Sequence, residues 1–291
     1  MTFNDNARVG DNRARRRGRG AVIAGGGTVG VGAIVVLLLA VFTGGDFSSL
    51  LGGESSPQAS DSGGSEIANC ETGQDANARD DCRLASASLA LDDFWSDAVP
   101  GYRPAQLVIV DVSTSSACGT ASNATGPFYC PPEETVYVDP TFFSLLRSQY
   151  NATAGPLAQL YVLAHEYGHH VQGITGVFDQ HPQNGTGPDS NGVRTELQAD
   201  CFAGAWVAGM TEAVDENGTP FLQPPTDTEI RDALNAAAAV GDDHIQQESG
   251  GLVNPESWTH GSSEQRQGWF GVGYRDGETA CDTFAVPGAQ L

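Results

Sequence analysis

The residues best suited to chemistry lie in one short segment, from Gly155 to Gly176. It contains His165, Glu166 and His169 in the spacing H-E-x-x-H. Leucines recur before the first histidine at intervals of three, which predicts a helix, and residues four apart share one helix face. Both imidazoles can therefore bind one metal ion, and the glutamate can reach a water on that metal.

The motif alone also fits a polar helix face with merely hydrogen-bonded histidines, so a third ligand is needed. A catalytic zinc ion takes three protein ligands and keeps one position open. A histidine six residues after His169 would indicate a metzincin, but Thr175 stands there. Further on, Glu196 and Asp200 are four residues apart on a second predicted helix. We predict that Glu196 is the third ligand and that Asp200 accepts the free ring N–H of a ligand histidine.

An oxyanion formed during hydrolysis needs a hydrogen-bond donor besides the metal. His260 is the first candidate for this catalytic role, with Tyr161 and Arg266 behind it. The competing interpretation makes His260 a structural histidine in a capped turn. His181 lies in a polar loop predicted at 178–192, which could overhang the cleft as a lid, and it is expected to be an exposed loop residue.

Several longer motifs accompany these residues. They are Gly126-Pro-Phe-Tyr-Cys-Pro, Val136-Tyr-Val-Asp, Phe142-Phe, His165-Glu-x-Gly-His-His-Val-Gln, Glu196-Leu-Gln-Ala-Asp-Cys-Phe-Ala-Gly, Gly241-Asp-Asp, Thr259-His-Gly-Ser-Ser-Glu-Gln-Arg and Cys281-Asp-Thr-Phe. On these motifs, more than half of the chain resembles the neutral zinc metallopeptidases of bacteria, a gluzincin-like, membrane-anchored family. The resemblance implies Zn²⁺ at His165, His169 and Glu196, with Glu166 as catalytic base. Tyr167 departs from the valine expected there, at a non-ligand position.

The order of predicted elements indicates the fold class. An upstream sheet, the zinc helix and further helices predict an α+β fold, a zincin-like metallopeptidase domain preceded by a single transmembrane helix. The strand at 135–138 is expected at a sheet edge beside the cleft, where it would pair with substrate backbone. Asp242, Asp243 and His244 either bind a second cation or stabilise a helix end. The elements predicted around the zinc helix are a helix at 84–99, strands at 107–112 and 135–138, and a helix at 228–240.

Composition narrows the class of protein. The 291 residues include 36 acidic residues and 14 basic ones, and every basic residue is an arginine. The formal net charge is −22. Such a charge repels phosphate, so no nucleic-acid partner is expected. The hydrophobic content of 40% suffices for a globular core. One domain of about 200–250 residues with additional segments is the natural expectation at this length.

The N-terminal part has a different charge pattern. Residues 1–20 hold six arginines and two acidic residues, whereas 21–45 have no charged residue. We predict a cytoplasmic arginine-rich segment at 1–20, a transmembrane helix at 21–45, a flexible linker at 46–66 and an extracytoplasmic domain at 67–291. A cleaved signal peptide and a twin-arginine export signal are the alternatives.

The six cysteines support an exported domain, because all of them follow the apolar segment. An even number in such a domain predicts disulfides. Six cysteines allow 15 connectivities, and local pairing is the simplest. The alternative, a thiolate zinc site, lacks any C-x-x-C spacing. The predicted disulfides are Cys70–Cys82, Cys118–Cys130 and Cys201–Cys281.

These observations predict a membrane-tethered zinc endopeptidase acting on exported or cell-surface polypeptides. A zinc amidase acting on cell-wall peptides is an alternative within catalysis. A zinc-stabilised interaction module without activity is an alternative of another class. Turnover separates the first from the last, and substrate type separates the two enzymes. The sequence does not indicate the oligomeric state.

Overall fold

The structure is a computed structural model that describes residues 2–10, 13–18, 64–149, 152–250 and 252–291. The predicted transmembrane helix and nearly all of the predicted linker lie outside these residues. Across the described ranges, no helix combines the length and the apolar character needed to cross a membrane.

Five strands form a mixed sheet in the order β2-β1-β3-β7-β6, and β4 and β5 form a separate pair. β1, β3 and β7 are parallel, while β2 and β6 are antiparallel to their neighbours at the two edges. Strands inside a parallel sheet are covered on both faces, which explains the continuous buried apolar run of β3. The strands are β1 (Arg15–Gly18), β2 (Ser65–Glu66), β3 (Gln106–Asp111), β4 (Ser113–Ser116), β5 (Gly119–Ser122), β6 (Phe128–Cys130) and β7 (Thr135–Val138).

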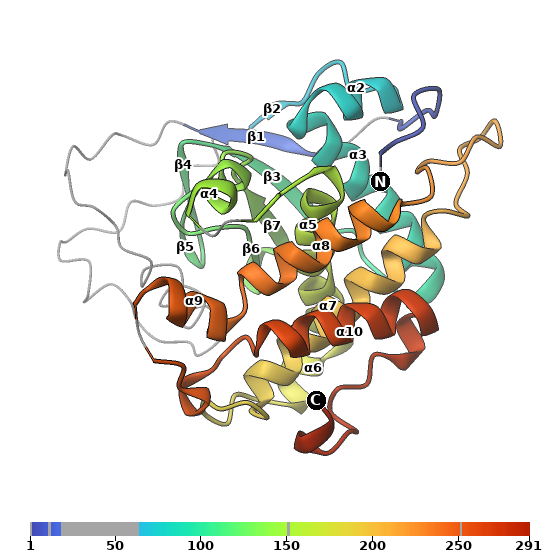
Figure 1. Ribbon diagram of the computed structural model, residues 1–291. Coiled ribbons are helices and arrows are strands. Elements are labelled where there is room, and N and C mark those ends of the chain that lie inside the picture. The colour runs from blue at the N-terminus through green and yellow to red at the C-terminus, as the bar shows by residue number, and fades with distance from the viewer. Residues whose placement is uncertain (1, 11–12, 19–63, 150–151, 251) are drawn as a thin grey trace.

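The helices pack on the sheet and on one another (Figure 1), and the mixed architecture confirms the predicted α+β class. α5 packs against α3, α7 and α8, and α7 packs against α10. The helices predicted at 84–99 and 228–240 are confirmed as α3 and α8. The helices are α2 (Gly73–Ala78), α3 (Asp80–Ala98), α4 (Phe142–Gln149), α5 (Pro156–Thr175), α6 (Val177–Gln180), α7 (Asn191–Gly209), α8 (Asp227–Ala239), α9 (Asp242–Glu248) and α10 (Ser263–Asp276).

α5, the helix that carries H-E-x-x-H, lies within the segment 155–176 for which a helix was predicted. It begins at Pro156, where the missing N–H of proline has no helical partner to lose. It ends before Gly176, whose φ of 79° is a left-handed conformation that glycine adopts without strain. Most of its length is buried because neighbouring helices cover it on several sides.

The strand predicted at 135–138 is confirmed as β7, but its predicted place at the sheet edge is wrong. β7 pairs with β3 on one side and with β6 on the other, and all four of its residues are buried. The edge strand next to β7 is β6, and β2 forms the opposite edge. With three residues, β6 is too short to show an alternating hydrophobic pattern in the sequence.

Residues 2–10 and 13–18, here called the N-terminal arm, pack against the domain. Phe3 is only 1% exposed, and its backbone N–H and carbonyl both bond to the Asn77 side chain, at 3.0 and 2.9 Å. A Cβ on Gly73 would lie 1.9 Å from the carbonyl oxygen of Asn4, so only glycine permits this contact. The arm is therefore fitted closely to α2.

The second half of the arm is a strand of the main sheet. β1 pairs with β3 from Arg15 to Gly18, and Arg16 forms an ion pair with Asp81. This differs from the expectation of a separate cytoplasmic segment before a domain that starts at residue 67. Two of the arginines that suggest membrane topology in the sequence, Arg8 and Arg16, form ion pairs with Glu216 and Asp81 of the domain.

All three disulfides have the predicted connectivity, and the chain has no free cysteine. Two of them close short loops of sequence separation 12, while the third spans 80 residues. The long-range bond joins α7 to the segment after α10, so it fixes two parts of the chain that lie next to the site described below.

If the arm belongs to the fold, Phe3→Ala should lower the free energy of unfolding by about 3–5 kcal/mol, because it removes a fully buried ring. Urea unfolding measures the change. Leu252→Ala is the control, since Leu252 is 94% exposed and should have nearly no effect. Equal unfolding midpoints for the two variants would show that the arm does not contribute to stability.

Candidate metal centre

Three predicted ligand residues converge at the contact between α5 and α7. One donor atom each from His165, His169 and Glu196 lies within 4.8 Å of the other two. The Glu196 oxygens are 3.2 Å from Nε2 of His165 and 3.5 Å from Nε2 of His169. All three residues are buried. Two imidazoles and one carboxylate form a donor set that suits zinc and leaves a position for a substrate or water.

A glycine within the motif brings the two helices together. A Cβ on Gly168 would be 3.0 Å from Cα and 3.1 Å from Cβ of Ala199, which is tighter than ordinary contact. Gly168 therefore allows α5 to approach α7 where Glu196 faces the histidines. The structure thus explains why glycine occupies one of the two variable positions of H-E-x-x-H.

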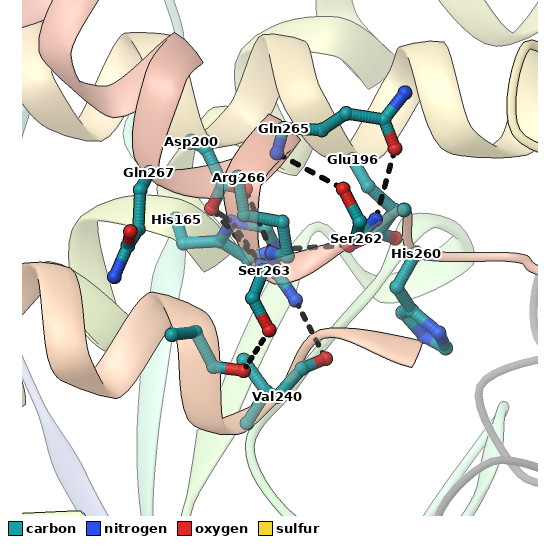
Figure 2. A network of polar contacts seen from close by, with 12 residues as sticks. His165, Glu196, Asp200, Val240, His260, Ser262, Ser263, Gln265, Arg266 and Gln267 are labelled. Carbon is teal, nitrogen blue, oxygen red and sulfur yellow. Dashed lines mark hydrogen bonds and ion pairs between the residues drawn. The ribbon is translucent and has the colours of Figure 1, made fainter. Parts of the chain in front are cut away.

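Asp200 orients the first histidine, as predicted. Its Oδ1 lies 2.8 Å from Nδ1 of His165, and it also accepts the hydroxyl of Tyr161. Arg266 donates to both Asp200 oxygens, at 2.8 and 2.9 Å (Figure 2). When Nδ1–H of His165 donates to Asp200, Nε2 is left to bind a metal.

Tyr161 and Arg266, which the sequence suggested as alternative oxyanion donors, have a different role in the structure. Both line the cavity at the site, but both hydrogen-bond to Asp200. Arg266 also donates to the Val240 carbonyl at 3.2 Å. Their polar groups stabilise a buried carboxylate instead of pointing to a substrate oxyanion as isolated donors.

Gln172 orients the second histidine, a role that the sequence interpretation missed. Its Oε1 lies 2.8 Å from Nδ1 of His169. Its amide nitrogen donates to the Thr195 carbonyl and to the Gln198 side chain, which fixes the amide. The signal was present, because Gln172 follows His169 by three residues on the same helix face.

Glu166 is buried next to the ligands and lines the same cavity. Burial raises the pKa of its carboxyl to about 7, with a hydrogen bond from the Tyr129 backbone among the opposing effects. A carboxyl with a pKa near neutrality can exchange a proton at neutral pH. Tyr129 belongs to β6, so the edge strand contacts the predicted catalytic base.

His260 lies in the loop before α10 and lines the cavity with the ligands. Its Nδ1 is 3.3 Å from Oδ1 of Asp242 and 2.9 Å from the Thr259 hydroxyl. Burial opposes the charged form, but the hydrogen bond with Asp242 and the charge of Glu196 raise the pKa of His260. Its other ring nitrogen, Nε2, is the one that can serve a molecule in the cavity.

Asp242 organises the loop that carries His260. One of its oxygens accepts the backbone N–H groups of Thr259, His260 and Gly261, at 2.7, 2.6 and 3.0 Å. The sequence suggested that Asp242 belongs to a cation site or stabilises a helix end, and it gave no sign of a contact with His260. The connection crosses 18 residues, so no local pattern reveals it.

The possible second cation site at 242–244 is not supported. Asp243 accepts the backbone N–H and hydroxyl of Ser263, and Nδ1 of His244 lies 3.2 Å from the Ala239 carbonyl oxygen. These contacts stabilise the start of α10 and the end of α8. Among the described residues, only one set of three or more histidine, cysteine or carboxylate side chains lies close enough together to hold a metal ion. That set is His165, His169 and Glu196.

The ligands face a cavity of about 80 Å³ that is open to solvent on one side. The lining residues are Thr125, Gly126, Pro127, Phe142, Leu146, Tyr161, Val162, His165, Glu166, His169, Glu196, Val240, Ile245, His260 and Arg266.

The chain also matches a known protein family. The family described as putative neutral zinc metallopeptidase matches residues 2–284, which is nearly the whole chain. The chain belongs to this family. The matched region starts at residue 2, so it includes the N-terminal arm as well as the metal centre.

Relatives of this zinc metallopeptidase family member occur in distant bacteria. The chain is 47% identical over 225 residues to the uncharacterized protein Rv2575 of Mycobacterium tuberculosis strain H37Rv, covering 77% of each chain. It is 37% identical over 263 residues to the uncharacterized protein YpfJ of Escherichia coli K12, covering 86% of this chain and 85% of the relative. No solved structure matches the chain.

His181 lies away from the metal centre of this family member. Its ring stacks on Phe284 with centroids 3.8 Å apart, and it lines a different surface depression. It is partly buried instead of fully exposed because Phe284 covers it. The structure therefore does not place His181 among the metal ligands.

Zinc binding by this site should release about one proton near neutral pH. Burial disfavours the charged form of His165, but the charge and hydrogen bond of Asp200 outweigh it and raise the pKa of the imidazole to about 10. Burial lowers the pKa of His169 to about 4, so that ring is already neutral. Zinc must therefore displace a proton from His165, and the apparent affinity should rise about tenfold per pH unit between roughly pH 6 and 8.

Competition with a chromophoric chelator at several pH values measures this slope for the apoprotein. His181→Ala is the control and should show the same slope as the wild type. An affinity that does not change with pH would contradict the protonated state assigned to His165.

Proposed function

We propose that this protein is a zinc-dependent peptidase. The observation that carries the proposal is the convergence of His165, His169 and Glu196 beside Glu166 in one cavity. The family to which the chain belongs supports the same conclusion. When bound, zinc supplies Lewis acidity, which polarises a scissile carbonyl and makes water a better nucleophile.

In this proposal, Glu166 is the general base and the general acid. Its carboxylate accepts a proton from the attacking water and passes it to the leaving amine. Glu166 is buried in the cavity beside the ligands, where its carboxylate can take a proton from a water molecule and release it again. Asp200 and Gln172 hold the ligand histidines in place during the reaction.

His260 is proposed to donate a hydrogen bond to the developing oxyanion. Asp242 fixes its ring through Nδ1 and supports the protonated form. Nε2–H can then donate to charge that develops in the cavity, which is where such a donor lowers the barrier most. This role rests on the shared cavity and on the Asp242 contact.

The substrate is proposed to be an extended polypeptide beside β6. One side of β6 pairs with β7, and the other is the edge of the sheet. Thr125, Gly126 and Pro127, immediately before β6, line the cavity. An extended chain can add to such an edge through main-chain hydrogen bonds.

We further propose that the enzyme acts outside the cytoplasm, as expected from the sequence. Three disulfides support an oxidising compartment. Because the N-terminal arm packs on the domain, this proposal places residues 2–18 in the same compartment, in contrast to the cytoplasmic position expected for them. A single transmembrane crossing at residues 21–45 would separate residues 2–18 from the domain, so this proposal does not include the tether predicted from the sequence.

Replacing Glu166 by alanine should lower peptide hydrolysis about 10²- to 10⁴-fold while one zinc per chain is retained, because Glu166 transfers protons and is not a ligand. Digestion of a peptide library with mass-spectrometric detection measures activity, and elemental analysis measures zinc. Glu248→Ala, an exposed change on α9, should behave as the wild type.

Full activity of Glu166→Ala would refute the assigned base. If the wild type binds zinc but cuts no peptide, wall-peptide fragments are the next substrates to test. Absence of turnover on these as well would favour the interaction module.

Replacing His260 by glutamine should lower kcat by roughly 10²- to 10³-fold with a small change in KM, because the lost interaction forms mainly in the transition state. Steady-state kinetics on a cleaved peptide measure both constants, and zinc content should stay at one per chain. A normal kcat in a folded, zinc-loaded variant would show that His260 does not stabilise the oxyanion and only supports the structure of its loop.

A further inference from the structure

The cavity beside the metal ligands has one wall made of large apolar side chains. We propose that these side chains form a specificity pocket, which selects peptide bonds flanked by a bulky apolar residue. The inference rests on the proposed peptidase function and adds the class of substrate. The side chains that form the wall, here called the apolar wall, are Phe142, Leu146, Val162, Val240 and Ile245.

The apolar wall is continuous with the metal centre. Val162 lies on α5 three residues before His165, so both point to the same face of that helix. The other members come from α4, from the link after α8, and from α9. Four segments of the chain thus place apolar groups next to the ligands, and a side chain beside the scissile bond would enter there.

The charged groups that line the cavity already have partners or functions. Arg266 donates to both oxygens of Asp200 and to the Val240 carbonyl, so it is neutralised before any substrate arrives. Glu196 faces the two histidines, and Glu166 is the proposed base. Among the described residues that line the cavity, no acid or arginine is therefore left uncommitted to recognise a charged side chain, whereas burial of an apolar one is favourable.

The pocket is also partly enclosed by the fold itself. Leu146 and Phe142 are almost fully buried, so α4 presents a fixed surface to the cavity. Ile245 and Val240 keep some exposed area, which a substrate side chain can cover. Recognition by such a surface depends on size and hydrophobicity and typically discriminates by about 10- to 100-fold.

Cut positions in a random dodecapeptide library test the inference on the zinc-loaded wild type. Leucine, isoleucine, phenylalanine, valine and methionine should be enriched about 10- to 100-fold over aspartate and lysine at one position next to the cut. Cuts without this enrichment, or with a preference for charged residues, would overturn the pocket while leaving the peptidase proposal intact.

Ile245→Lys tests the position of the pocket, because Ile245 is partly exposed and a lysine can be accommodated at the mouth. The apolar preference should fall at least about tenfold, with aspartate and glutamate gaining at the same position. Leu252→Lys is the matched control, since it makes the same kind of change on the surface, and its preference should equal that of the wild type. An unchanged preference in folded Ile245→Lys would overturn the assignment.

A binding measurement separates failure of the pocket from failure of the proposed function. Fluorescein-labelled Gly-Ser decapeptides with one central leucine, aspartate or lysine are titrated into zinc-loaded Glu166→Ala, and anisotropy is recorded. The leucine peptide should bind at least about tenfold more tightly than the other two. This result without any cleavage by the wild type would refute peptidase activity but support the pocket; equal binding would overturn the pocket.

Discussion

The buried carboxylate of Asp200 is the group on which the metal centre depends. Asp200 has no exposed surface, and a buried carboxylate is costly to ionise. Nearby positive charge and hydrogen bonds must offset the lost hydration. Arg266 on α10 supplies the opposite charge, and Tyr161 and His165 on α5 supply further hydrogen bonds. One side chain on α7 therefore connects three helices, and the same contacts fix the ring of a metal ligand.

Other features of the fold serve this contact. Gly168 allows α5 to approach α7 closely, and the Cys201–Cys281 disulfide holds α7 to the chain beyond α10. The Gln198 amide donates to the Cys281 carbonyl at 2.9 Å, next to the Gln172 amide that orients His169. Packing, disulfide and hydrogen bonds therefore all hold the helices at the separation that the ligands require.

The candidate ligands could be predicted because their signals are local. H-E-x-x-H and the pair of carboxylates on α7 have helical spacings that fix their faces from the sequence alone. The contact of Asp242 with His260 could not be predicted, because it links residues far apart in the chain through backbone N–H groups. The place of β6 and the apolar wall likewise depend on how several elements meet.

The N-terminal arm shows a different limit. Clustered arginines before an uncharged run have the pattern of a membrane topology signal. In the fold, Phe3 is buried against α2 and Arg16 pairs with Asp81, so the same residues take part in tertiary packing. Charge bias does not distinguish the two uses, because an arginine can face a membrane or an acidic domain surface equally well. The family match from residue 2 agrees with a structural part for the arm.

Zinc K-edge anomalous diffraction from crystals of the zinc-loaded protein tests the central claim most directly. The account predicts one zinc per chain bonded to Nε2 of His165, Nε2 of His169 and a carboxylate oxygen of Glu196, at about 2.0–2.2 Å. The Glu166 carboxylate should lie outside bonding distance. A zinc peak at other residues, or one bonded to Glu166 in place of Glu196, would contradict the account.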